Sequence, residues 1–96
     1  MIEYEQKERY TLEDFRNIVA ILRHPGGCPW DQAQTHHSIR RNLLEETYEL
    51  LEAIDTENTE LMREELGDVM MQVLFHASME EDAGRFDIED VADHAC

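Results

Sequence analysis

The stretch NLLEETYELLEA, residues 42–53, has the spacing of an amphipathic helix but carries an acid where an apolar residue belongs. Apolar residues at positions 39, 43, 50 and 53 follow the 4-3-4-3 spacing of a buried helical seam. The missing middle position is Glu46, with Glu45 and Glu49 on the edges of the same face. Clustered buried carboxylates repel each other and lose hydration. Either this face is open to water, or a cation lies against it.

A second acidic pair follows in the stretch REELGDVMMQ, residues 63–72. Glu65 and Asp68 are three residues apart, as are Glu46 and Glu49, and such side chains share one face of a helix. They lie beside an expected apolar stripe made of Met62, Leu66, Val69 and Val73. The short polar turn DTENT separates the two helices, so we expect them to be antiparallel neighbours. The four carboxylates would then converge in one cleft.

The rest of the chain also predicts helices. Apolar periodicity indicates helices over about 12–23, 38–55, 60–81 and 86–94, and no strand pattern is present. The expected N-terminal caps of the first three are Thr11, Ser38, and either Asn58 or Thr59. Two glycines and two prolines predict a loop in the stretch HPGGCPWDQAQTHH. We therefore expect an all-α antiparallel bundle of about four helices. It forms a single domain over residues 11–96 behind a polar lead-in of residues 1–10. A chain of 96 residues has a modest core, so we expect oligomerisation to complete it.

Composition excludes several partners. The formal net charge is −15 and Lys7 is the only lysine, which argues against nonspecific nucleic-acid binding and against docking on an anionic membrane. No run of about 18 apolar residues occurs, so no membrane span is expected. The charged N-terminal stretch MIEYEQKERY predicts no secretory signal. Two cysteines without a framework of pairs favour a reduced, cytoplasmic setting.

Four converging carboxylates favour a hard divalent cation. Magnesium prefers oxygen ligands and keeps waters or phosphate oxygens in its shell. Gly67, between Glu65 and Asp68, costs about 1 kcal/mol relative to alanine in a helix and would allow close helix approach or keep the cleft open. The plain alternative is a solvated acidic face in a chain with 23 acidic residues.

A zinc site fits no standard spacing, although it can be drawn from His24, Cys28, His36 and His37. His76 is expected to be a hydrogen-bonded core histidine.

The acidic motifs of the chain resemble those of a known family. EETYE followed by ELGD has the form E-E-x-x-E, a spacer and E-x-x-D, which marks the all-α nucleoside triphosphate pyrophosphohydrolases. Within that superfamily the segments CPWDQAQTHHSI and EDAGRFDIEDV are similar to MazG. The resemblance covers roughly residues 12–93, and the acidic pattern combined with CPWD and GRF is highly specific.

The resemblance implies an activity and roles for the acidic residues. MazG-like enzymes use magnesium, for which manganese can substitute, to hydrolyse a nucleoside triphosphate to the monophosphate and pyrophosphate. By motif position Glu46, Glu49, Glu65 and Asp68 would hold the metal, and Glu45 would be a further ligand or orient the attacking water. Glu45, Glu46 and Glu49 form the expected catalytic set. The resemblance further implies removal of unwanted nucleotides from the pool by a homodimer or homotetramer.

Substrate contacts are expected from three further residues. Asn42 lies one turn before the acidic pair, and Arg41 could contact a phosphate, as could Arg40, Arg63 and Arg85 unless they form local ion pairs. Trp30 either packs as core or walls the nucleotide pocket. Family members typically continue with a basic stretch resembling RRHPHVF, whereas this sequence stops at Cys96, so weaker phosphate binding is expected.

Other functions remain open on the sequence alone. One is a narrower pyrophosphatase of the dUTPase or dCTPase type, which base specificity would separate from a MazG-like enzyme. Another is a catalytically idle acidic helical module that binds metal or a partner. The third is a dimerisation domain with a solvated acidic face, for which magnesium would produce no stabilisation.

Overall fold

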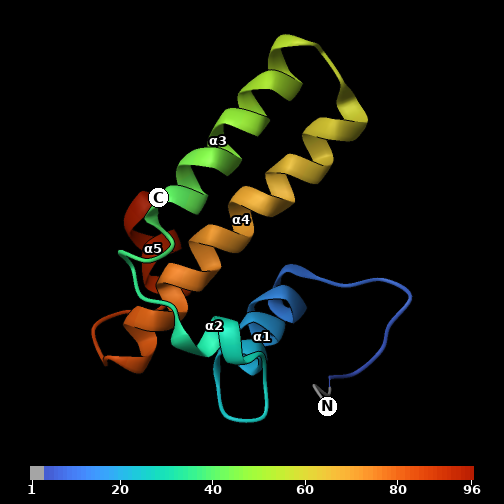
Figure 1. The fold of residues 1–96 in the computed structure, drawn as a ribbon. Helices are drawn as coiled ribbons and strands as arrows, with labels where there is room; N and C mark the ends of the chain where they lie inside the picture. Colours follow the sequence, from blue (N-terminus) through green and yellow to red (C-terminus); the bar gives the residue numbers. More distant parts are fainter. Residues whose placement is uncertain (1–3) are drawn as a thin grey trace.

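A long antiparallel helical hairpin dominates the computed structural model, which describes residues 4–96. It pairs α3 (Arg40–Asp55) with α4 (Thr59–Asp82). Three shorter helices gather around one end of that hairpin: α1 (Leu12–Arg23), α2 (Pro29–Ala33) and α5 (Ile88–Ala95) (Figure 1). The expected all-α class is confirmed, with five helices within residues 4–96 instead of about four. The first three residues of the expected lead-in lie outside the described residues, and residues 4–10 form no helix.

Local signals set the helix ends. Thr11 caps α1 through a reciprocal pair of hydrogen bonds with Asp14, as the cap preference predicts. Asn58 caps α4 by accepting a hydrogen bond from the backbone N–H of Leu61. The expected Ser38 cap is wrong: α3 begins at Arg40, and Ser38 instead exchanges hydrogen bonds with Thr35 in the preceding turn.

The expected loop between the first two long helices contains the short helix α2. Pro29 occupies its first turn, where a proline needs no N–H partner and its fixed φ favours the helix. Gly27 allows the chain to turn there, because a Cβ at this position would lie 2.2 Å from the backbone oxygen of Ile21. The two prolines and two glycines therefore mark a turn that leads into a helix.

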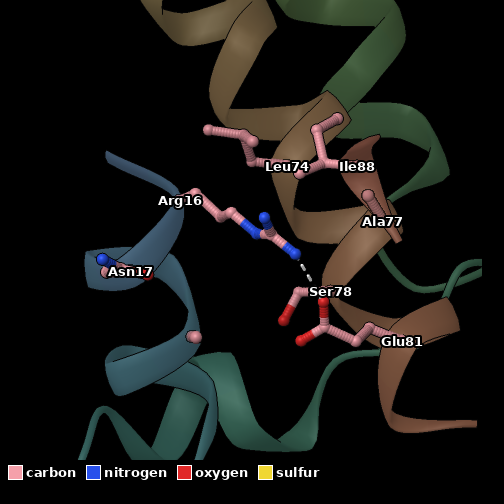
Figure 2. Close-up of a pocket in the computed structure, with 8 residues that line it drawn as sticks. Arg16, Asn17, Leu74, Ala77, Ser78, Glu81 and Ile88 are labelled. Carbon is pink, nitrogen blue, oxygen red and sulfur yellow. Dashed lines mark hydrogen bonds and ion pairs between the residues drawn. The ribbon is translucent and has the colours of Figure 1, made fainter. Parts of the chain in front are cut away.

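The core lies at one end of the molecule. Val19, Ile39, Leu74 and Phe75 form its buried centre, with Phe15 and Ile88 packed against it. Arg16 of α1 crosses beside this core to Glu81 of α4 at 2.8 Å, next to a cavity of about 150 Å³ between α1, α4 and α5 (Figure 2). This end of α4 is therefore enclosed on several sides.

The other end of the hairpin is poorly covered. Of the helices in the described part of the chain, α3 packs only on α4. In the expected apolar stripe on α4, Leu66 is 52% and Val73 38% exposed, whereas Met62 and Val69 are half-buried. No helix within residues 4–96 combines the length and apolarity that a bilayer crossing requires.

Candidate functional site

The hairpin brings two acidic pairs together. Glu46 and Glu49 come from α3, and Glu65 and Asp68 from α4. One carboxylate oxygen of each of the four lies within 4.8 Å of the others. The i, i+3 spacing and the short hairpin turn together produce this convergence, because residues of the two antiparallel helices face each other across the seam. We call these four residues the acidic cluster.

The cluster is partly desolvated. Glu65 is only 7% exposed, and Glu46 is half-buried. Burial raises the pKa of Glu46, and the charges of Glu49 and Asp68 raise it further. Burial, followed by hydrogen bonding to Glu49, raises the pKa of Glu65 to about 7. Without a counter-charge, the cluster therefore holds a proton near neutral pH.

The donor set fits a hard divalent cation. One carboxylate oxygen of Glu46 and one of Glu65 are buried without any hydrogen-bond partner, an arrangement that is costly unless something binds them. Oxygen ligands at this spacing suit magnesium or manganese better than zinc. Gly67 does not serve close helix approach, because a Cβ there would meet nothing within 4 Å.

The alternative zinc arrangement does not form. His24 contacts Asp82 at 2.9 Å, and His36 contacts His76 at 2.6 Å. Within residues 4–96, the acidic cluster is the only group of three or more His, Cys, Asp or Glu side chains close enough to hold a metal ion.

The other predicted site residues lie outside the cluster. Glu45 pairs with Arg41 at 3.2 Å on the exposed face of α3. Asn42 is half-buried one turn before the cluster. Trp30 does not pack as core: it is 56% exposed, on a helix that contacts α1 and not α3 or α4. Within one chain, Trp30 therefore does not wall the acidic cluster.

Three of the four candidate phosphate-binding arginines form ion pairs nearby in sequence. Arg41 pairs with Glu45, Arg63 with Glu60, and Arg85 with Glu80. The local ion-pairing alternative therefore describes these arginines. A bound triphosphate would have to compete with their carboxylate partners.

Gln72 is a further polar residue of this seam that was not predicted from the sequence. Its Oε1 is buried without a hydrogen-bond partner, one turn after Asp68 and one turn before His76. The signal was available, because steps of four residues from Asp68 keep Gln72 and His76 on one face of α4. The same seam therefore continues from acidic to neutral polar groups.

Comparison with known proteins identifies the family of this chain. Residues 34–96, which include the whole acidic cluster, match the MazG nucleotide pyrophosphohydrolase domain. The nucleoside triphosphate pyrophosphohydrolase/pyrophosphatase MazG of Thermotoga maritima is 53% identical over 80 residues, covering 83% of this chain and 31% of that protein. The nucleoside triphosphate pyrophosphohydrolase of Escherichia coli K12 is 49% identical over 81 residues, with the same two coverages.

A further relative has no assigned activity. The uncharacterized protein YabN of Bacillus subtilis is 53% identical over 90 residues, covering 94% of this chain and 18% of that protein. This chain therefore spans between about a fifth and a third of the length of these three relatives. The domain match covers about two thirds of the chain, and its acidic pairs form one cluster. The resemblance seen in the sequence is confirmed: the chain belongs to the MazG nucleotide pyrophosphohydrolase domain family.

Proposed function

We propose that this chain hydrolyses nucleoside triphosphates to the monophosphate and pyrophosphate, with Mg²⁺ held by Glu46, Glu49, Glu65 and Asp68. Mn²⁺ would substitute, because it accepts the same oxygen ligands. The observation that carries the proposal is the convergence of four carboxylates, with two buried oxygens that have no partner. Family membership and the names of the relatives point to the same reaction.

In the proposed reaction, each of the acidic residues would have a separate role. The bound cation supplies charge neutralisation for the triphosphate and lowers the pKa of a bound water. Glu46 and Glu65, buried at the seam, fix the coordinating oxygens, while Glu49 and Asp68 complete the set. Glu45, which lies outside the cluster and pairs with Arg41 on the exposed face of α3, would orient the attacking water and accept its proton. The water oxygen forms a bond to the α-phosphorus, the bond from that phosphorus to the bridging oxygen breaks, and pyrophosphate leaves.

The first experiment identifies products from a panel of nucleoside and deoxynucleoside triphosphates with Mg²⁺. Monophosphate and pyrophosphate support the proposal, and a preference for one base would identify a narrower dUTPase-like or dCTPase-like enzyme. Diphosphate and orthophosphate would show attack at another phosphorus. Nucleotide binding without turnover would favour a catalytically idle module.

Matched variants test the residue assignments. Glu46→Gln and Asp68→Asn should each lower turnover at least a hundredfold while preserving the fold, because each loses a ligand charge and relieves repulsion. Glu45→Gln should lower turnover but leave cation binding unchanged. Glu52→Gln, an exposed substitution on the same helix, is the control. Full turnover in Glu46→Gln or Asp68→Asn would contradict the ligand assignment.

We further propose that the chain forms a homodimer or homotetramer through the exposed apolar face of the hairpin. Leu44, Tyr48 and Leu51 of α3 and Leu66 of α4 are between 47% and 64% exposed. The accessible surface is 7252 Å², against roughly 5,700 Å² for a compact monomer of 11.3 kDa, and the exposed side chains of this face contribute to the excess. Burial of such a face provides the driving force for a stable subunit interface.

Analytical ultracentrifugation of wild type and Leu66→Glu tests the assembly. The variant should shift the protein to monomer, because a charge cannot be buried unpaired in an apolar interface. Leu12→Glu, at a 63% exposed position on α1, is the control and should leave assembly unchanged. A monomeric wild type at micromolar concentration would contradict the proposal.

We also propose that the protein acts in the cytoplasm on the nucleotide pool, where its free cysteines stay reduced.

A further inference from the structure

A second polar network lies at the far end of α4 from the acidic cluster. His36, in the turn before α3, places its Nδ1 2.6 Å from Nδ1 of His76 on α4. The other nitrogen of His36, Nε2, is 2.9 Å from a carboxylate oxygen of Glu80, also on α4. Glu80 in turn accepts hydrogen bonds from Arg85 in the turn after α4. We call His36 and His76 the histidine pair.

The two rings of the histidine pair lie edge to edge. Their planes are parallel within 5°, and their centroids are 4.9 Å apart. The two Nδ1 atoms are 2.6 Å apart, which is closer than the planes of two rings stacked face to face can approach. The contact between the two nitrogens therefore lies in the plane of the rings. The gap is too narrow for a metal ion between the two nitrogens, whose bonds to a metal would each be about 2 Å. It has the length of a short hydrogen bond and holds one proton.

The contact between the two rings limits how many protons the histidine pair can hold, and therefore its positive charge. Hydrogen bonding to Arg85 is the main cause that lowers the pKa of Glu80, so this carboxylate is an ionised acceptor. His36 must therefore carry a proton on Nε2. Its Nδ1 then either accepts the proton of His76 Nδ1 or donates its own to that atom. If both rings were fully protonated, two N–H groups and two positive charges would meet across 2.6 Å.

The side chains around the histidine pair are mostly apolar and would not stabilise a second positive charge on it. Beside the histidine pair is a cavity of about 360 Å³, to which α3 contributes Leu43, α4 contributes Val73 and Ala77, and α5 contributes Val91. Glu80 is the only other charged group among the described residues that line it, and it already pairs with Arg85. Nε2 of His76 is buried without a hydrogen-bond partner. Burial, and then the charge of His36, lowers the pKa of His76.

The contact joins two parts of the fold that are distant in sequence. The segment 34–39 leads into α3, whose first turn has no side-chain cap. Hydrogen bonds within the segment, and from Gln34 to the backbone of α2, hold its local turn. Its attachments to α4 are the burial of Ile39, which is 2% exposed, in the core that contains Leu74, and the bonds of His36. Release of His36 would therefore loosen the start of the helix that carries Glu46 and Glu49.

We propose that the histidine pair is a pH-sensitive switch that fastens residues 34–39 to α4 while it holds one shared proton, and releases them when it takes up a second. Loss of the contact on acidification follows from repulsion between the two imidazolium rings. The device depends only on the geometry of the histidine pair and is independent of the reaction proposed for the acidic cluster.

The test compares unfolding of wild type with His76→Asn from pH 7.5 to 5.5. The amide oxygen introduced there can accept the Nδ1 proton of His36 but cannot take up a proton itself. A group whose pKa is lowered on folding contributes stability that is lost as pH falls. The ratio of folded to unfolded wild type should therefore fall relative to the variant by up to about tenfold per pH unit, the slope of one proton. His37→Asn, at the exposed neighbouring histidine, should behave like wild type.

Two further measurements locate the effect. Amide hydrogen exchange of residues 34–39, corrected for intrinsic rates, should accelerate at pH 5.5 in wild type and in His37→Asn but not in His76→Asn. Imidazole ¹⁵N spectra of wild type should show that His76 takes up a proton only below the pKa of the free side chain. Parallel stability curves for wild type and His76→Asn, or two histidines that titrate independently near 6.5, would overturn the proposal.

Discussion

The two halves of α4 differ in what covers them. In the C-terminal half, Leu74, Phe75 and Ala77 are buried, and α1 and α5 pack there. In the N-terminal half, the only buried residue is Glu65, and the apolar side chain of Leu66 is exposed. One continuous helix thus has a core at one end and an acidic cluster at the other.

One half of α4 therefore stabilises the fold, while the other half carries the candidate site. Burial of apolar side chains stabilises the C-terminal half. In the N-terminal half, carboxylates occupy the place where a core would lie, so this half opposes folding until a cation or a proton neutralises them. Departures from good packing are expected at sites that serve a ligand.

The largest expected effect follows from deleting a core side chain. Phe75→Ala should lower the free energy of unfolding by about 3–5 kcal/mol, because it leaves a cavity at a site that is 4% exposed. Leu66→Ala, in the exposed half, should change the free energy of unfolding of the monomer by less than about 0.5 kcal/mol. Urea unfolding at low protein concentration measures both. Equal losses would show that the two halves do not differ.

A divalent cation should act on the other half. At a Mg²⁺ concentration a hundred times the dissociation constant, wild type should gain about 2.7 kcal/mol by linkage, seen as a higher Tm. Glu46→Gln should gain much less, because one ligand charge is lost. The control is NaCl at matched ionic strength. If Mg²⁺ raised the Tm of both proteins equally, the cation would bind elsewhere.

The same cluster predicts a pH dependence without metal. The pKa of Glu65 is about 7 in the folded protein, above its ordinary value of 4.5, so its ionised form opposes folding above pH 7. In a chelator, the contribution of Glu65 to Tm should therefore rise as pH falls from about 7 toward 4.5, the range in which folded Glu65 holds a proton that the unfolded chain has released. Glu65→Gln should remove most of this rise. Identical pH profiles for wild type and Glu65→Gln would contradict the raised pKa.

A smaller effect is expected inside the acidic pair of α4. Gly67→Ala should raise the free energy of unfolding by about 1 kcal/mol, because alanine favours the helix and the added Cβ meets nothing within 4 Å. Chemical denaturation measures this gain, and a turnover assay accompanies it. Preserved turnover would show that the space stays open in the working enzyme. Lost turnover with the same gain in stability would show that substrate or a second copy occupies it.

The smallest effects concern the turns at the two ends of α4. Glu57, before α4, and Gly84, after it, both have left-handed backbone, with φ of 52° and 73°. Glu57→Gly should raise the free energy of unfolding by about 0.5–1 kcal/mol, since a side chain is disfavoured in that conformation. Gly84→Ala should lower the free energy of unfolding by a similar amount. Thermal unfolding of both variants tests this, and a change of the same sign in both would contradict it.

Several features were predictable because their causes are local. The Thr11 cap, a second cap at Asn58 or Thr59, and the Asp55–Thr59 turn were predicted from residue type and position, and Asn58 is the second cap. The convergence of Glu46 and Glu49 with Glu65 and Asp68 needed only helical periodicity and a short hairpin. The helix α2 was missed because Pro29 was read as a breaker, although proline is favoured in a first helical turn.

Other features depended on which elements meet. The sequence by itself determined an all-α chain and two acidic pairs that face each other, because capping, periodicity and turn length act over a few residues. Only the tertiary structure decided that Leu66 and Val73 are exposed, that Trp30 lies away from the cluster, and that His36 meets His76. The last contact joins residues 40 positions apart, and exposure depends on whether a neighbour packs there. Periodicity identifies the apolar positions of a helix, but the arrangement of the other helices decides which of them are covered.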